Sequence, residues 1–160
     1  MRKRSKYRPK GVILNPIAYV MESMTPVAKH ASYLIDLKIR NHAAMTALTR
    51  GIATKTDMDD LIAMANISEA LSRLGFGQEY ADITRTGLNA LHEVGKRGMA
   101  DPTKPKFILR SSDMKALNEL MELHDAQMDV ITIKDMERAI DIVNEEFRQR
   151  KMRPILERNK

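Results

Sequence analysis

Residues 33–51 read YLIDLKIRNHAAMTALTRG, and as a helix this stretch is apolar on most of its sides. A helix with such a surface is usually buried on most sides. Three consecutive polar residues, Arg40, Asn41 and His42, interrupt it. Successive residues of a helix point about 100° apart, so at least one of the three faces inward and needs a hydrogen-bond partner.

The stretch lies within a long helix that the sequence predicts over residues 26–50. Thr25-Pro26 supplies a cap and a first residue for it, and Gly51 supplies its end. Asn15-Pro16 gives the same start signal for a short preceding helix. Capping residues and helical apolar spacing predict further helices that begin near Thr56, Gln78, Ser111 and Thr132. Thr56 with Asp59, and Thr132 with Asp135, have the spacing of a capping box. Gly87 inside one of them costs roughly 1 kcal/mol relative to Ala, which indicates close packing against another helix.

The sequence therefore predicts an all-α fold, a single-domain bundle of about five helices around the long central helix at about 26–50. Residues 12–150 form the helical domain, between a basic N-terminal arm at 1–11 and a basic C-terminal tail at 151–160. The apolar run 107–109 is expected to lie extended across the core or to pair as a minor strand. A homodimer would cover any apolar surface of the long helix that one chain leaves exposed.

Composition narrows the class of protein. The 160 residues are 43% hydrophobic but only 4% aromatic, with no Trp and 12 Met, so we expect an aliphatic, adaptable core. The absence of Cys excludes disulfides and thiolate metal sites and fits a cytoplasmic protein. The chain has no run of about 18 apolar residues and no recognisable signal peptide, so no membrane span is predicted.

Charge is concentrated at the two ends of the chain. Residues 1–10 carry six basic groups and no acid, and residues 148–160 carry six basic groups and one acid, so the ends total +11. The whole chain is +6, which leaves −5 for residues 11–147. This pattern is typical of a mildly acidic globule with basic arms. The predicted nucleic-acid contacts are Arg2, Lys3, Arg4, Lys6, Tyr7, Arg8, Lys10, Arg150, Lys151 and Arg153.

Such arms suit contact with phosphates, which releases condensed counterions and weakens steeply with salt. They hold few side chains that read bases, so they would position the protein or add sequence-independent affinity. The alternatives are an arm that only solubilises the chain, that folds against the acidic body, or that binds an acidic protein. A helix-turn-helix between residues 56 and 96 is disfavoured, because Glu79 and Asp82 would begin its recognition helix.

Histidines raise the alternative of a metal-dependent helical hydrolase, formed by His42, His92, His124 and Asp125. Adjacent residues such as His124 and Asp125 point in different directions on a helix, however, and no Glu-x-x-His pair indicates a di-iron centre. The favoured interpretation is a set of buried polar residues, in which one His has a hydrogen-bond partner from the same set. No catalytic residue, metal site or cofactor is predicted, and the predicted buried polar residues are Arg40, Asn41, His42, His124 and Asp125.

Four strings of the sequence are distinctive: KYRPK (6–10), IRNHAAMTAL (39–48), LHDAQMD (123–129) and ERAIDIV (137–143). They resemble a group of uncharacterised small α-helical proteins encoded by proteobacterial phages and prophages, and the similarity spans most of the chain. That group has no established activity, so no functional residue is carried over. The resemblance implies the cytoplasm of a bacterial host cell and an accessory role on a mobile element.

The leading hypothesis is a non-enzymatic accessory or regulatory protein of a phage-like element that contacts nucleic acid, DNA or RNA, through its basic ends. The alternative is a helical module that uses a Met-rich surface to bind or inhibit a host protein. The metal-dependent hydrolase is the third class.

Overall fold

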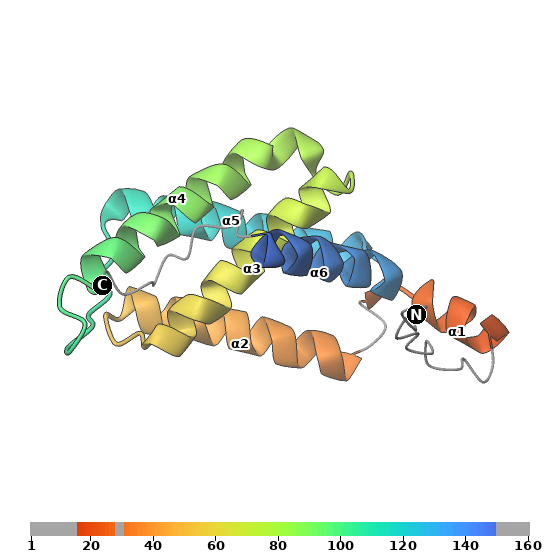
Figure 1. Cartoon of the computed structure of the whole chain (residues 1–160), viewed down its shortest axis with the longest axis horizontal. Coiled ribbons are helices and arrows are strands. Elements are labelled where there is room, and N and C mark those ends of the chain that lie inside the picture. Colours follow the sequence, from red (N-terminus) through yellow and green to blue (C-terminus); the bar gives the residue numbers. More distant parts are fainter. Residues whose placement is uncertain (1–15, 28–30, 150–160) are drawn as a thin grey trace, which may run out of the picture.

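Short polar turns divide the chain into helices in the computed structural model, which describes residues 16–27 and 31–149. A short 3-10 helix, η2 (Gln78–Tyr80), precedes the fourth of six α-helices. The described residues contain no strand, so the predicted all-α class is confirmed. The predicted arm at 1–11 and the predicted tail at 151–160 both lie outside the described residues. The α-helices are α1 (Pro16–Ser23), α2 (Ala31–Thr49), α3 (Lys55–Arg73), α4 (Ala81–Gly98), α5 (Ser111–Val130) and α6 (Ile133–Arg148) (Figure 1).

Capping boxes begin two of the long helices. The predicted pair of Thr132 and Asp135 is confirmed at α6: the Thr132 N–H donates to Asp135 Oδ2 at 2.9 Å, and the Asp135 N–H donates back to Thr132 Oγ1 at 3.2 Å. The box of α3 uses Thr54 and Asp57, two residues earlier than predicted. Gly51 follows the end of α2 with a φ of 68°, the left-handed conformation that glycine adopts most easily.

The helix at the centre of the bundle is α3. It contacts α2, α4, α5 and α6, and Figure 1 shows it crossing between α2 and the other long helices. The prediction that residues 26–50 form the central helix is therefore wrong. Because α2 packs mainly on α3, it buries a face with Ala44, Met45 and Leu48 but leaves Ile39 61% exposed.

The start of α2 also differs from the prediction. Residues 25–27 lie beside the α5–α6 turn, where Pro26 forms an isolated antiparallel bridge with Thr132. The Val27 N–H donates to the Ile131 carbonyl at 3.0 Å, and the Ile133 N–H donates to the Thr25 carbonyl at 3.1 Å. Val27 is 1% exposed in this position. The buried Val27 side chain and the two backbone hydrogen bonds fix residues 25–27 against the α5–α6 turn. The α2 helix runs from Ala31 to Thr49, and residues 28–30 lie outside the described residues.

Two close contacts fix how α4 packs. Gly87 confirms the predicted close approach, because a Cβ there would lie 2.6 Å from Leu120 Cδ2 on α5. Gly98 lies against the ring of Phe107, which is 1% exposed. The segment 107–109 therefore places Phe107 in the core and forms neither a helix nor a strand.

A buried polar network joins α3 to α5 through Gln127, which is 2% exposed. Its Oε1 accepts from Ser68 Oγ at 2.7 Å, and its Nε2 donates to Ser72 Oγ at 3.1 Å and to the Phe76 carbonyl at 2.9 Å. The network supplies hydrogen-bond partners for polar groups that would otherwise be buried without any.

Among the helices of the described residues, none is long and apolar enough to cross a membrane.

The contact at Gly87 yields a stability prediction. We expect Gly87→Ala to lower the free energy of unfolding, because overlap of the new methyl group with Leu120 costs about 1–3 kcal/mol. The gain of roughly 1 kcal/mol in helix propensity offsets part of this cost, so the expected net loss is up to about 2 kcal/mol. Denaturant unfolding measures the difference, with Asn89→Ala at an exposed position of α4 as the matched control. A Gly87→Ala protein as stable as the control would contradict this packing.

Candidate functional site

The α2–α5 seam, defined by Lys38, His42, Asp125 and Asp129, brings together charged residues that lie far apart in the sequence. His42 Nε2 lies 2.9 Å from Asp125 Oδ2, and Lys38 Nζ lies 3.4 Å from Asp129 Oδ1. Each pair is displaced by four residues from the other on both helices, so the two ion pairs follow one another along the seam. The side chain of His42 is 52% exposed, which places its pair with Asp125 at the surface.

Two polar residues lie beneath these pairs in the core. Asn41 is 3% exposed and His124 is 2% exposed. Asn41 comes directly before His42 in the sequence, and His124 comes directly before Asp125. Asn41 Oδ1 and His124 Nδ1 have no hydrogen-bond partner in the described part of the chain. A buried polar atom without a partner typically costs about 1–3 kcal/mol, so these two groups reduce the stability of this part of the core.

Burial determines the charge of His124. Loss of solvation lowers the pKa of His124 to about 4. The charge of Asp125 acts against this shift, and electrostatic interactions with Lys38 and His42 act in the same direction as burial. His124 is therefore neutral at physiological pH. Its imidazole is a polar but uncharged member of the core.

The structure separates the five residues that were predicted to be buried. Asn41 and His124 are buried, and Asp125 is partly buried. The prediction is wrong for His42 and for Arg40, whose Nε pairs with Asp60 Oδ1 at 3.5 Å while its side chain stays 55% exposed. The reason is that α2 lies at the edge of the bundle, so only one of its three consecutive polar residues is enclosed.

The residues of the metal-site alternative meet only in part. His42 and Asp125 are in contact, whereas His92 belongs to α4 and His124 is enclosed in the core. Within residues 16–27 and 31–149, no group of three or more His, Asp or Glu side chains is arranged to hold a metal ion. The seam offers one imidazole held by one carboxylate, an arrangement that orients a ring and its proton.

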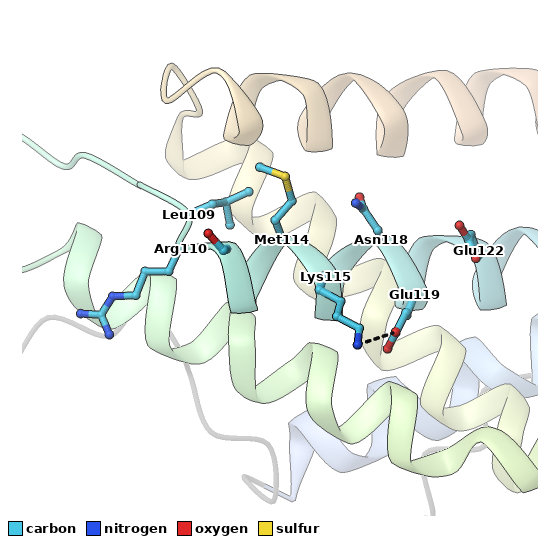
Figure 2. A pocket seen from close by; sticks show the side chains of 8 residues that line it. Leu109, Arg110, Met114, Lys115, Asn118, Glu119 and Glu122 are labelled. Atoms are coloured by element: carbon cyan, nitrogen blue, oxygen red, sulfur yellow. Dashed lines mark ion pairs between the residues drawn. The ribbon is translucent and has the colours of Figure 1, made fainter.

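A groove of about 480 Å³ runs along α5, outside the seam. Figure 2 shows its side chains along the first half of the helix, with the Lys115–Glu119 ion pair, 3.9 Å long, among them. Basic side chains, Arg110 and Lys115, lie toward the start of α5, and acidic ones, Glu119 and Glu122, lie further along. The walls are largely exposed and charged, unlike the enclosed apolar pockets that hold most small ligands.

All ten predicted nucleic-acid contacts, in the segments 2–10 and 150–153, lie outside the described residues. Many cations of the described body are instead engaged with its own acids, as in the contact of Arg97 with Asp113. The cations found in such ion pairs are Lys38, Arg40, Arg73, Arg85, Arg97, Lys115 and Arg148. The body therefore neutralises much of its own positive charge.

Sequence reasoning missed the role of Gln127 in the buried network with Ser68 and Ser72. A signal was available, because Gln127 falls beside Met128 on the inward side of a helix, and polar residues there need partners.

Comparisons of the chain with protein-family models, with curated proteins and with solved structures found no match. The resemblance to phage-encoded proteins therefore stays a prediction.

The buried state of His124 predicts how stability depends on pH. Its pKa is about 4 in the folded protein against an ordinary value of 6.5, so between these values the unfolded chain binds a proton that the folded chain does not. The free energy of unfolding should therefore fall as pH drops from 6.5 to 4, and His124 should contribute about 3 kcal/mol of that fall.

Denaturant unfolding at pH 7, 5.5 and 4 measures this contribution. We expect His124→Gln to reduce the loss of stability across this range, since Gln does not titrate. The control is Asn89→Ala, an exposed position without a titratable group, which should keep the wild-type pH dependence. Identical pH profiles for the wild type and His124→Gln would show that His124 is not held neutral in the core.

Proposed function

We propose that this protein is a non-enzymatic accessory protein of a phage-like element and that it contacts nucleic acid electrostatically through its basic ends. One observation carries the proposal. The described residues hold 15 Lys and Arg against 20 Asp and Glu, a net charge of −5, while the whole chain is +6. The remaining residues, almost all at the two ends, therefore carry +11.

Phosphate contact is the chemistry that such ends favour. Each phosphate that a Lys or Arg neutralises releases condensed counterions, and the gain in entropy supplies sequence-independent affinity. The arm 1–11 contains no Asn or Gln, the side chains that best read adenine. Its role is therefore to attach and position the protein on the backbone rather than to select a sequence.

The ion pairs of the described body support the proposal that the ends, and not the body, provide most of the phosphate contacts. Seven cations of the described residues already face carboxylates, such as Lys38 with Asp129 and Arg40 with Asp60. A phosphate that approached them would compete with an existing partner and would meet the negative charge of that carboxylate. The ends, by contrast, contain a single acid, Glu157, among their cations.

The proposal is tested by binding of full-length protein to labelled duplex DNA, duplex RNA and single-stranded DNA across a salt series. We expect the logarithm of affinity to fall linearly with the logarithm of salt concentration. Replacing the six cations of the arm by Gln should reduce that slope by up to about 5, because each phosphate that is no longer neutralised removes about 0.9. The replaced residues are Arg2, Lys3, Arg4, Lys6, Arg8 and Lys10.

A matched control separates position from total charge. The triple variant Arg85→Glu, Lys134→Glu and Arg138→Glu changes net charge by the same −6, at exposed positions of α4 and α6. It should lose much less affinity than the arm variant. Failure of the full-length protein to bind any of the three nucleic acids at low salt would refute the proposal, and equal losses in the two variants would remove the special role of the arm.

A second candidate function, binding of a protein partner, is supported by α1. Its Ile17, Val20 and Met21 are 74%, 57% and 70% exposed, and their spacing places them on one side of the helix. Met24, directly after the helix, is 58% exposed. Large apolar side chains that cluster in solvent are typical of a docking surface, either for a host protein or for a second copy of this chain.

The α1 surface is tested by the double variant Val20→Glu and Met21→Glu. If α1 binds a partner, the variant should lose protein captured from nuclease-treated bacterial lysate, or should change from dimer to monomer in light scattering. Ile52→Glu is the control, because Ile52 is 63% exposed in the α2–α3 turn. A wild-type protein that is monomeric and captures nothing would exclude this second candidate.

A further inference from the structure

We infer that the described body carries a second, ordered phosphate-contact surface, which we call the basic end and define as the cations of residues 96–115. This inference rests on the proposed function, because it assigns a further contact to the same nucleic acid. Acids within the same residues are Asp101 and Asp113 only. The basic end comprises Lys96, Arg97, Lys104, Lys106, Arg110 and Lys115.

The basic end gives the body a marked charge polarity. Residues 96–115 carry +4, so the rest of the described residues, whose sum is −5, carry −9. Figure 1 shows the segment as the last turn of α4, the loop to α5 and the first turn of α5, all at one end of the bundle. The neighbouring α2–α3 turn adds no net charge, because Arg50 and Lys55 are offset by Asp57 and Asp59.

The two acids of the segment are both engaged in local contacts. Asp113 Oδ2 accepts from the Arg97 guanidinium and from the Arg110 N–H at 2.9 Å, so it neutralises Arg97 and caps the start of α5. Asp101 Oδ1 accepts from the N–H of Thr103 at 3.0 Å and from its hydroxyl at 2.6 Å. Neither carboxylate lies in an ion pair with Lys96, Lys104, Lys106 or Arg110 in the described structure.

Backbone contacts hold the loop in one conformation. The Lys106 N–H donates to the Gly98 carbonyl at 3.0 Å, and the Lys104 N–H donates to the Asp101 carbonyl at 3.1 Å. Phe107 anchors the loop in the core against Gly98. Since Lys104 and Lys106 project from an ordered backbone, phosphate binding does not have to order the loop, and less conformational entropy is lost.

The position of Arg110 adds to the positive potential. Figure 2 shows its side chain extending away from the start of α5. The Asp113 carboxylate already caps the N-terminus of α5, so the attraction for anions at this point comes from the Arg110 guanidinium, which has no ion-pair partner in the described structure. Lys115 marks the limit of the surface, because it already pairs with Glu119.

The chemistry of the segment favours the backbone of a duplex over exposed bases. Its sole aromatic residue, Phe107, is 1% exposed and therefore unable to stack on a base. It contains no Asn or Gln to read base edges. Exposed Lys and Arg side chains on a rigid loop fit the regularly spaced phosphates of double-stranded DNA or RNA.

The inference is tested in the full-length protein with the triple variant Lys104→Gln, Lys106→Gln and Arg110→Gln. We expect the salt slope for duplex binding to fall by about 2–3 and the affinity at 0.1 M salt to weaken by about tenfold or more. The control is Arg85→Gln, Lys134→Gln and Arg138→Gln, which removes the same charge from exposed sites on α4 and α6 and should weaken binding by about twofold or less. Thermal melting checks that both variants are folded.

The outcomes distinguish this inference from the proposed function. If the wild type binds duplex but both triple variants weaken it equally, the basic end is not a contact surface, while the role of the arms stands. If the wild type binds no nucleic acid at low salt, both fail. Parallel measurements with duplex DNA and duplex RNA show which backbone the surface prefers, and stronger binding of single strands than of either duplex would overturn the assignment.

Discussion

Burial of one wide face of α3 against four other helices is the constraint on which the rest of the structure depends. The residues Met58, Leu61, Ala65 and Leu71 are each at most 1% exposed, and they face α2, α4, α5 and α6 from one helix. With so few aromatic residues in the chain, this core is built from Leu, Met and Ala, which pack closely only if the helix axes approach closely. Gly87 provides one such approach, and the Gln127 network provides the polar contact that fixes the position of α5 against α3.

The edge position of α2 follows from the central position of α3, and it determines the character of the α2–α5 seam. One face of α2 is covered, so Asn41 is buried while its neighbours Arg40 and His42 reach the surface and pair with acids of α3 and α5. Asn41 Oδ1 and His124 Nδ1 lie buried beneath this seam without a hydrogen-bond partner, which lowers the free energy of unfolding. The seam thus combines surface ion pairs, which contribute little to stability, with buried groups that reduce it.

Local sequence signals predicted the fold class and most helices, and they failed where tertiary contacts compete with them. Thr132 and Asp135 form the predicted capping box, in which their side chains hydrogen-bond to each other and to each other's backbone N–H. At Pro26, where the long helix was predicted to begin, the chain instead forms a backbone bridge with Thr132, and Val27 is buried beside Ile131. Periodicity placed His124 correctly on an apolar stripe, but it gave no sign of which of Arg40, Asn41 and His42 faces inward, since that depends on where α2 sits in the bundle. Summed charge likewise identified the basic N- and C-terminal segments of the chain. It did not reveal the basic end formed by the cations of residues 96–115, because the acids of α5 and α6 outweigh them in the sum.

Electrostatic attachment to a nucleic-acid backbone is the central claim, and chemical-shift mapping tests it most directly. Isotope-labelled full-length protein would be titrated with a short duplex at low salt while backbone amide resonances are followed by NMR. We predict shifts in residues 1–11 and 96–110, and unchanged resonances for the acidic faces of α5 and α6. Shifts confined to α1, or none at all at saturating duplex, would contradict the claim.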